Sequence, residues 1–304
     1  MSDPKVAAER AAALRAMVED VIGDVLPSLD DPRLSSFGAS RLVEAMRYSL
    51  TAPGKRLRPA LLLAAAEACG GRPRDLVRFA AGLEMIHAYS LVHDDLPAMD
   101  DDELRRGLPT NHVVFGEAMA ILAGDALLTE AFALMLEPVT DPLRQMEVVA
   151  EIARAAGWRG MVGGQAGDVL AEGADPSAEA LRSIHERKTG ALLAVAVRAG
   201  ARLAGAGDEQ IEPLDRFSEH FGLAFQIADD IKDEVASTEV SGKSGGGDRK
   251  AGKMTYPALY GVVRSRELLV QELDLAAAAL AEFGERGAVL ELLARESVAP
   301  VLES

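Results

Sequence analysis

The chain has 304 residues, of which 49% are hydrophobic and 26% are charged, a composition typical of a globular protein and not of a disordered one. Its formal net charge of −16 argues against a protein that binds a nucleic-acid backbone, because no broad basic surface is expected. Only 4% of the residues are aromatic, alanine and leucine are abundant, and alternating β-branched runs are scarce. These features predict an all-α fold.

The single cysteine, Cys69, excludes an intramolecular disulfide and is typical of a protein in a reducing cytoplasm. The opening stretch MSDPKVAAERAAAL is charged and has no apolar core, so no secretory signal is expected. No run approaches the roughly 18 apolar residues of a membrane-spanning helix, so no membrane partner is expected either. No break in composition divides the chain, and one domain over residues 1–304 is predicted.

Basic residues are concentrated near the start of the chain. Helices are predicted at residues 5–26, 40–50 and 60–69. Lys55, Arg56 and Arg58 lie just before the third of these helices, after the helix-breaking pair Pro53 and Gly54. Cations beside the exposed N–H groups of a helix start predict an anion site, with a solvated basic turn as the alternative.

An acidic cluster follows the apolar helix that is predicted to start at Asp75. Its members are Asp94, Asp95, Asp100, Asp101 and Asp102. These carboxylates repel one another unless cations neutralise them, and hard oxygen ligands select Mg²⁺ or Ca²⁺. Asp94 and Asp100 would lie on different faces of an ideal helix, but the break at Pro97 allows the chain to bring them together. A solvated acidic helix end is the alternative.

The middle of the chain contains predicted core helices and a second candidate cation, Lys188. Core helices are predicted at residues 116–136 and 142–156. The small residues at 160–168 allow close approach by another helix or a ligand, and close packing is the simpler interpretation. A further helix from Ser177 leads to Lys188 and Thr189, just before the apolar run 191–197. A lysine that enters a buried helix needs an anionic partner unless its amine extends to solvent.

A second acidic cluster consists of Asp229, Asp230 and Asp233. Asp229 and Asp233 lie one helical turn apart on one face, with Gln226 nearby one turn earlier, so the two carboxylates can share a metal ion. One such motif is a weak signal. Two of them, each beside a strongly apolar flank, predict two walls of one pocket that holds a diphosphate through magnesium.

The Gly-rich stretch 241–252 follows the second acidic cluster. Its glycines predict a mobile loop, and Lys243, with Lys253 just beyond the stretch, would bring positive charge over a bound diphosphate. A plain flexible linker is the alternative. Two terminal helices are predicted at residues 265–283 and 286–294.

Six ordered motifs resemble those of the trans-isoprenyl diphosphate synthases, the polyprenyl synthetase family, most closely the bacterial farnesyl type. They are GKRLRP at 54–59, HDDLPAMDDDELRRG at 93–107, GGQAGD at 163–168, KTG at 188–190, FQIADDIKD at 225–233 and GKMTYPALYG at 252–261. The resemblance runs over essentially the whole chain. It implies a single-domain helical bundle, usually a homodimer, around a central active-site cavity.

The resemblance also implies roles for individual residues. Several magnesium ions would be held by Asp94, Asp95, Asp100, Asp229, Asp230 and Asp233. The allylic diphosphate would be held by Arg105, Lys188, Thr189, Gln226, Lys243 and Lys253. Isopentenyl diphosphate would be held by Lys55, Arg58, His87 and Arg106. The residues implied to act directly in catalysis are Asp94, Asp100, Arg105, Lys188, Thr189 and Asp229.

The implied reaction joins isopentenyl diphosphate to dimethylallyl or geranyl diphosphate. Product length would be set near Tyr89 and Ser90, because Tyr89 lies five residues before Asp94, roughly 7.5 Å back along the helix. An aromatic residue there, together with the two-residue insertion in the first motif, goes with a C15 product in the family. Lys232 departs from the family pattern, which has an apolar residue at that position.

Three alternatives remain open from the sequence. A geranylgeranyl diphosphate synthase would differ only in the depth of its cavity. A terpene cyclase shares the ionisation step, but it has no need for the second aspartate motif or the GKRLRP site. A non-catalytic subunit or acidic scaffold would tend to lose its aspartates, and this chain keeps both sets.

Overall fold

The computed structural model describes residues 4–35, 37–171, 178–235 and 255–302. The α-helices are α1 (Pro4–Ile22), α2 (Ala39–Leu50), α3 (Leu57–Ala68), α4 (Pro73–Asp94), α5 (Asn111–Phe115), α6 (Glu117–Met135), α7 (Pro142–Ala156), α8 (Met161–Ala171), α9 (Ala178–His185), α10 (Ala191–Leu203), α11 (Asp208–Val235), α13 (Tyr256–Tyr260), α14 (Val262–Ala279) and α15 (Ala288–Leu302). The remaining elements are the 3₁₀ turns η1 (Pro32–Ser35) and η3 (Ala281–Gly287), the π-helical turn η2 (Glu186–Gly190), and the strands β1 (Leu104–Arg105) and β2 (Leu108–Pro109). The predicted all-α class is confirmed.

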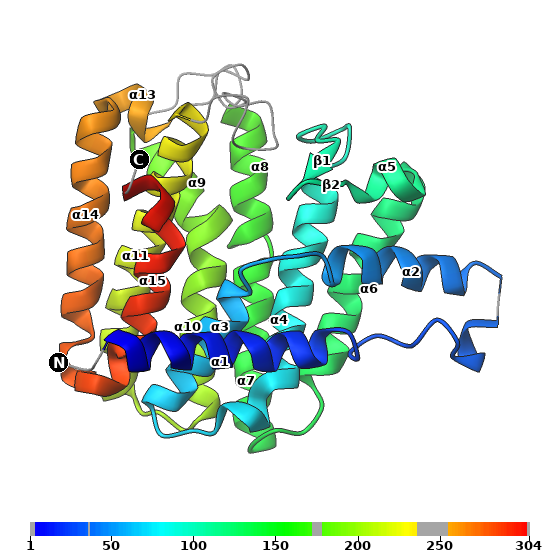
Figure 1. The fold of residues 1–304 in the computed structure, drawn as a ribbon, viewed down its shortest axis with the longest axis horizontal. Coiled ribbons are helices and arrows are strands. Elements are labelled where there is room, and N and C mark those ends of the chain that lie inside the picture. The colour runs from blue at the N-terminus through cyan, green and yellow to red at the C-terminus, as the bar shows by residue number, and fades with distance from the viewer. Residues whose placement is uncertain (1–3, 36, 172–177, 236–254, 303–304) are drawn as a thin grey trace.

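The helices form a bundle in which α4, α6, α8, α11 and α14 run side by side and α1 lies across them (Figure 1). Helix α3 is buried throughout from Pro59 to Ala66, as expected for a helix that is apolar on every face. Helix α10 packs closely on it, because a Cβ atom at Gly200 would lie only 1.9 Å from the carbonyl oxygen of Leu62. One hydrophobic cluster extends from α1 to α15 through these two central helices.

Most predicted helices occur, but some boundaries differ. Helix α1 ends at Ile22 instead of residue 26, and α14 begins at Val262 instead of residue 265. The last helix continues to Leu302, well beyond the predicted end at residue 294. The buried residues Val298 and Val301 continue the apolar face of α15 beyond the predicted end.

A short hairpin between α4 and α5 was not predicted. Leu104 pairs with Pro109 and Arg105 with Leu108 in antiparallel register. The two loop residues, Arg106 and Gly107, both have positive φ angles of 54° and 78°. This is the backbone that a tight two-residue hairpin turn requires, and glycine supplies half of it without steric cost. The hairpin carries both arginines of the first motif.

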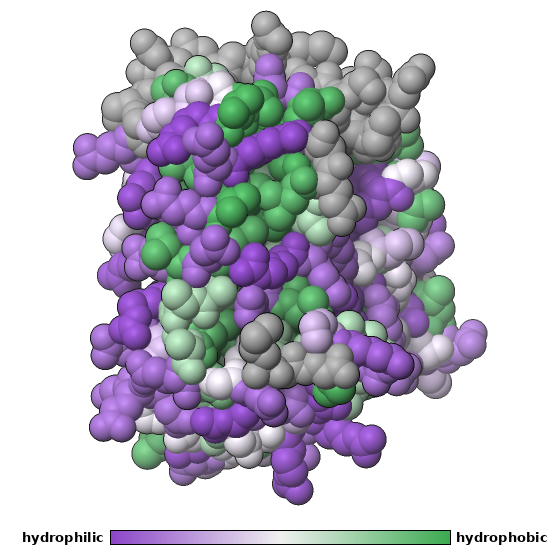
Figure 2. Space-filling model, turned by 60° about the vertical axis from the view of Figure 1, so that its left-hand side comes forward, coloured by the Kyte–Doolittle hydropathy of each residue, from purple (hydrophilic) through white to green (hydrophobic). Residues whose placement is uncertain are grey.

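Hydrophilic side chains predominate on the face shown in Figure 2, with smaller apolar areas between them. Helix α6 differs, because its length and composition would allow it to cross a membrane. The prediction that no run approaches the length of a membrane-spanning helix was therefore wrong for this helix. Only 39% of its apolar window is buried within the chain. Its exposed apolar residues include Ile121 and Leu122, and Val113 on the adjacent α5 is exposed as well.

Candidate active site

The first acidic cluster begins where α4 ends. The helix stops at Asp94, three residues before Pro97, and the chain then turns back on itself. The backbone N–H of Asp100 donates to the carbonyl of Asp94 at 2.9 Å, and that of Asp101 donates to Leu96 at 3.1 Å. The expected break therefore does bring Asp100 back to the helix end. Asp101 has a φ of 51°, an unusual angle for a residue with a side chain.

Asp95 is buried at the base of this loop and makes an ion pair with the hairpin. The Nε of Arg105 donates to Asp95 Oδ1 at 2.6 Å, and its Nη2 lies 3.4 Å from Asp102. A charge-assisted pair of this kind is strongest when it is shielded from water. Asp95 therefore fixes the position of Arg105 on the hairpin.

Asp94 has a different environment, although it is the neighbouring residue. Burial raises the pKa of its carboxyl to about 6, and the nearby charges of Asp100 and Asp95 act in the same direction. The charge of Lys188 is the largest influence that opposes this shift. Lys188 lies in η2, so the structure places η2 within electrostatic reach of the first acidic cluster.

The four residues predicted to bind isopentenyl diphosphate are called the basic cluster: Lys55, Arg58, His87 and Arg106. The charges of Arg58 and Arg106 act on His87, and the charge of Arg106 acts on Lys55 and Arg58. Burial, followed by the charges of its cationic neighbours, lowers the pKa of His87 well below its ordinary value. Burial also lowers the pKa of Arg58 to about 10, and its Nε is buried without a partner. Buried positive charges that repel one another favour the binding of an anion, which would neutralise them.

Arg56 does not belong to this anion site, although the sequence suggested that it would. It is buried, and its guanidinium donates to Glu84 at 3.1 Å and to Glu19 at 2.7 Å. A third bond, of 2.8 Å, reaches the carbonyl of Ala52. Arg56 therefore ties α1 and α4 to the loop before α3, and its φ of 45° lets the backbone turn there.

The second acidic cluster has two kinds of carboxylate. Asp229 is exposed and Asp233 is half-buried, whereas Asp230 is buried. Asp230 accepts the backbone N–H of Tyr256 at 2.9 Å and the amide of Gln226 at 3.0 Å. Asp230 therefore connects α11 to the start of α13, and Gln226 bonds Asp230 within α11.

Asp229 lies within electrostatic reach of the basic cluster. Its charge raises the pKa of both Lys55 and Arg58, against the larger lowering by burial. Lys232 is exposed, as expected for a residue off the metal-binding face, and its charge contributes to the lowered pKa of Lys55. The second acidic cluster and the basic cluster therefore line the same site.

Lys188 and Thr189 lie in the π-helical turn η2, an irregularity that is frequent at functional sites. The amine of Lys188 bonds Asp168 on α8 at 2.5 Å, which supplies the anionic partner that the sequence required. Gly164 makes this approach possible, since a Cβ atom there would lie 2.2 Å from the backbone nitrogen of Lys188. The small residues of α8 thus serve close packing. Lys243 and Lys253 lie outside the described residues.

The two residues expected to control product length lie on α4. Tyr89 is buried, and its ring contacts His93 edge to face with centroids 5.8 Å apart. The imidazole of His93 in turn bonds the carbonyl of Ile121 on α6 at 3.0 Å. Ser90 donates to the carbonyl of His87 at 2.9 Å. The ring of Tyr89 is therefore held against His93, and it is His93 that contacts α6.

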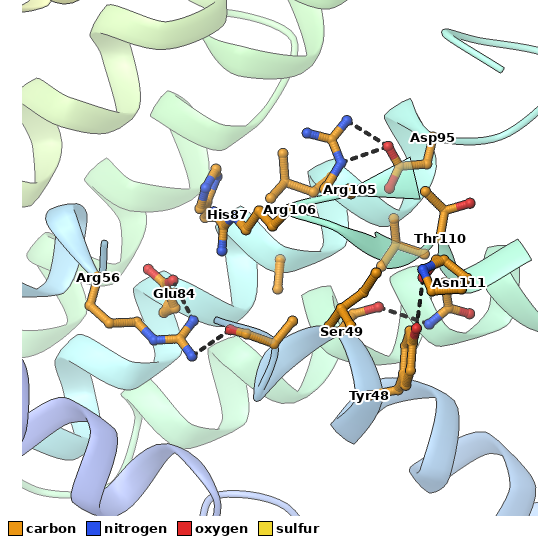
Figure 3. A pocket seen from close by; sticks show the side chains of 16 residues that line it. Tyr48, Ser49, Arg56, Glu84, His87, Asp95, Arg105, Arg106, Thr110 and Asn111 are labelled. Atoms are coloured by element: carbon orange, nitrogen blue, oxygen red, sulfur yellow. Dashed lines mark hydrogen bonds and ion pairs between the residues drawn. The ribbon is translucent and has the colours of Figure 1, made fainter. Parts of the chain in front are cut away.

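Figure 3 shows a cavity of about 50 Å³ beneath the hairpin. Arg105, Arg106 and His87 line one side of it, and Thr110 and Asn111 line the other. Sequence patterns had not drawn attention to Thr110, Asn111 or Glu84. The sequence offers only a weak signal for these three residues, because isolated polar residues that become buried have no characteristic spacing.

The donor set suits magnesium. No group of three or more acidic, histidine or cysteine side chains converges on a single metal position within the described ranges. Mg²⁺ usually keeps several waters and binds through one or two carboxylates together with substrate phosphates. Carboxylates in two clusters, each within electrostatic reach of cations, fit that mode of binding.

The chain belongs to the polyprenyl synthetase family, whose model matches residues 39–283. A farnesyl diphosphate synthase of Bacillus subtilis is 51% identical over 231 residues, which cover 75% of this chain and 78% of that protein. One from Escherichia coli is 47% identical over 86% of this chain and 89% of its own length.

Relatives with other products match nearly as well. A geranylgeranyl diphosphate synthase of Cyanophora paradoxa is 47% identical over 76% of this chain and 79% of that protein. The crystal structure of an FPP/GFPP synthase from Zymomonas mobilis superimposes with a TM-score of 0.80 at 37% identity, covering 95% of this chain and 99% of that one.

Proposed function

We propose that this chain is a short-chain trans-prenyltransferase that joins isopentenyl diphosphate to dimethylallyl or geranyl diphosphate and releases farnesyl diphosphate. The observation that carries the proposal is the electrostatic coupling of both acidic clusters to cations. Lys188 acts on Asp94, while Asp229 acts on Lys55 and Arg58. A site with separate metal-binding and anion-binding walls suits two diphosphates at once.

The reaction begins when the C–O bond of the allylic diphosphate breaks and pyrophosphate leaves with the bonding electrons. Lys188 and Arg105 would attract that leaving group, and the basic cluster would hold isopentenyl diphosphate so that its double bond attacks the allylic cation. The departing pyrophosphate accepts the proton that is then lost. The protein thus acts through orientation and preorganised charge, and it needs no side-chain nucleophile.

Exposure divides the six aspartates into two groups. Asp94, Asp100, Asp229 and Asp233 are at least partly exposed and would hold the magnesium ions, whereas Asp95 and Asp230 are buried. We propose that this buried pair supports the site through Arg105 and Tyr256. Magnesium, when bound, neutralises the charge on the leaving pyrophosphate.

Farnesyl diphosphate is favoured as the product because Tyr89 is bulky, buried and fixed against His93. The names of the similar relatives favour the same product. A geranylgeranyl product is the second candidate, since synthases of that name are also close in sequence.

The test is to incubate the purified protein with Mg²⁺, isopentenyl diphosphate and either allylic primer, and to measure product length by mass spectrometry. A dominant C15 product is expected. A dominant C20 product would instead favour the second candidate, and no condensation would refute the proposed activity. Asp94→Asn should lower kcat at least about a hundredfold, because it removes a charge needed in the transition state. Asp75→Asn removes a carboxylate from the other end of the same helix and should leave activity unchanged.

We also propose that the protein is a homodimer and that it works in the cytoplasm. Val113 on α5 and Ile121 and Leu122 on α6 are 45–52% exposed, which leaves apolar side chains of two adjacent helices uncovered. A second copy that packs on α5 and α6 would bury them and would explain why so apolar a helix is only 39% buried within one chain. The free thiol of Cys69 supports a reducing compartment.

A further inference from the structure

We propose that Asn111 is a positioning residue for diphosphate binding, because it fastens the arginine-bearing hairpin to α2. The inference rests on the proposed function and concerns residues outside the basic and acidic clusters. Three residues of the hairpin end, Pro109, Thr110 and Asn111, together with Tyr48 and Ser49 on α2, are called the brace. None of the five is among the residues assigned to substrate or metal above.

The bonds of the brace join the hairpin to α2. The amide of Asn111 donates to the carbonyl of Ala45 at 2.8 Å and to the hydroxyl of Ser49 at 2.8 Å. The hydroxyl of Tyr48 donates to the carbonyl of Pro109 at 2.7 Å. Asn111 is only 2% exposed, so water does not compete for its bonds. These hydrogen bonds therefore hold the end of the hairpin that leads into α5 against α2.

The same end of the hairpin is bonded to the metal-binding loop. Thr110, also buried, donates its hydroxyl to the carbonyl of Asp102 at 2.7 Å, and its backbone N–H donates to Glu103 at 2.9 Å. Arg106 in turn donates to the carbonyl of Pro53 at 2.7 Å. Because Asp95 holds Arg105 separately, a shift of the brace would mainly move Arg106 relative to the rest of the site.

Packing alone does not fix the hairpin. The cavity of about 50 Å³ lies between it and helices α2 and α4 (Figure 3). The apolar side chains of the hairpin, Leu104 and Leu108, are exposed and bury little apolar surface. A two-stranded hairpin without a packed apolar face is marginally stable. The hydrogen bonds of the brace therefore restrain the hairpin that carries Arg106, in addition to the ion pair by which Asp95 holds Arg105.

The experiment compares Asn111→Ala and Tyr48→Phe with the unmodified protein. Tyr48→Phe keeps the ring contact with Phe115, whose centroid lies 5.5 Å away, and removes only the hydroxyl. We expect Asn111→Ala to raise the KM for isopentenyl diphosphate by about tenfold and Tyr48→Phe by about threefold, with kcat changed by less than about twofold, since a buried hydrogen bond contributes that order of binding energy. Calorimetric titration with isopentenyl diphosphate should show matching losses of affinity.

Gln145→Ala is the matched control. Gln145 is similarly buried, and its amide donates to the carbonyls of Met135 at 2.7 Å and Glu137 at 2.6 Å, away from the hairpin. It should lower the Tm without changing the KM. Unchanged KM and affinity in both brace variants would overturn the inference, as would an equal rise in KM for Gln145→Ala. An unmodified protein that binds isopentenyl diphosphate but makes no product would refute the proposed function alone, because the titration still tests the brace.

Discussion

Replacing Asp94 by asparagine should stabilise the metal-free protein at pH 8. Burial raises the pKa of this carboxyl from 3.8 to about 6. The folded state therefore binds protons more tightly than the unfolded state, and the stability that this group contributes is lost as the pH rises from about 4 to 6. A shift of two pKa units corresponds to about 3 kcal/mol, since one unit corresponds to about 1.4 kcal/mol.

Asparagine keeps the shape of the side chain and carries no charge, so Asp94→Asn should regain that energy. The gain should be on the order of 3 kcal/mol at pH 8 and less than about 1 kcal/mol at pH 4, which lies close to the unfolded-state pKa, where little of the linkage energy has built up. Urea denaturation in the presence of EDTA, at one protein concentration, measures both values. The neutral variant would thus be more stable and less active, as expected for a charge that is buried in order to bind a metal.

Asp100→Asn is the matched control, because it removes an exposed carboxylate from the same loop. It should change the free energy of unfolding by less than about 0.5 kcal/mol at either pH. Equal gains for the two variants would mean that general repulsion within the loop matters more than burial of Asp94. A gain for Asp94→Asn that is as large at pH 4 as at pH 8 would refute the reasoning.

Three further predictions concern the walls of the site and the surface. Tyr89→Ala should lengthen the product by at least one C5 unit, because it removes a bulky buried ring about one turn before the first acidic cluster. Mass spectrometry of the products would show an unchanged distribution if Tyr89 has no such role. Arg56→Met should lower the free energy of unfolding by about 3–5 kcal/mol, because it leaves Glu84 buried without its partner, and adding Glu84→Gln should recover much of this loss in urea denaturation. Leu122→Glu should convert the dimer to a monomer in light scattering, whereas Leu29→Glu, at a similarly exposed site outside α5 and α6, should not. A monomeric unmodified protein would contradict the proposed interface.

The sequence by itself determined the helical class and the chemistry available to the site. Apolar periodicity predicted most helices, since a helix buries one face wherever its neighbours lie. The helix break at Pro97 is likewise local, because it follows from the backbone of proline itself. The aspartates, arginines and lysines of the six motifs were identified because their types and spacings are visible in the chain. Lys188 was recognised for the same reason as a lysine that needs an anionic partner, but its partner, Asp168, was not identified.

Tertiary structure decided what each of these residues does. Arg56 and Arg58 are two positions apart in similar sequence surroundings, yet Arg56 bonds Glu19 and Glu84 while Arg58 lies in the basic cluster. Adjacent Asp94 and Asp95 differ in the same way, because only Asp95 is bonded to Arg105. Burial, ion pairing and pKa depend on segments that are distant in the chain, and no local pattern records which of them will meet. The brace at Asn111 is of this kind, since its bonds join residues more than sixty positions apart.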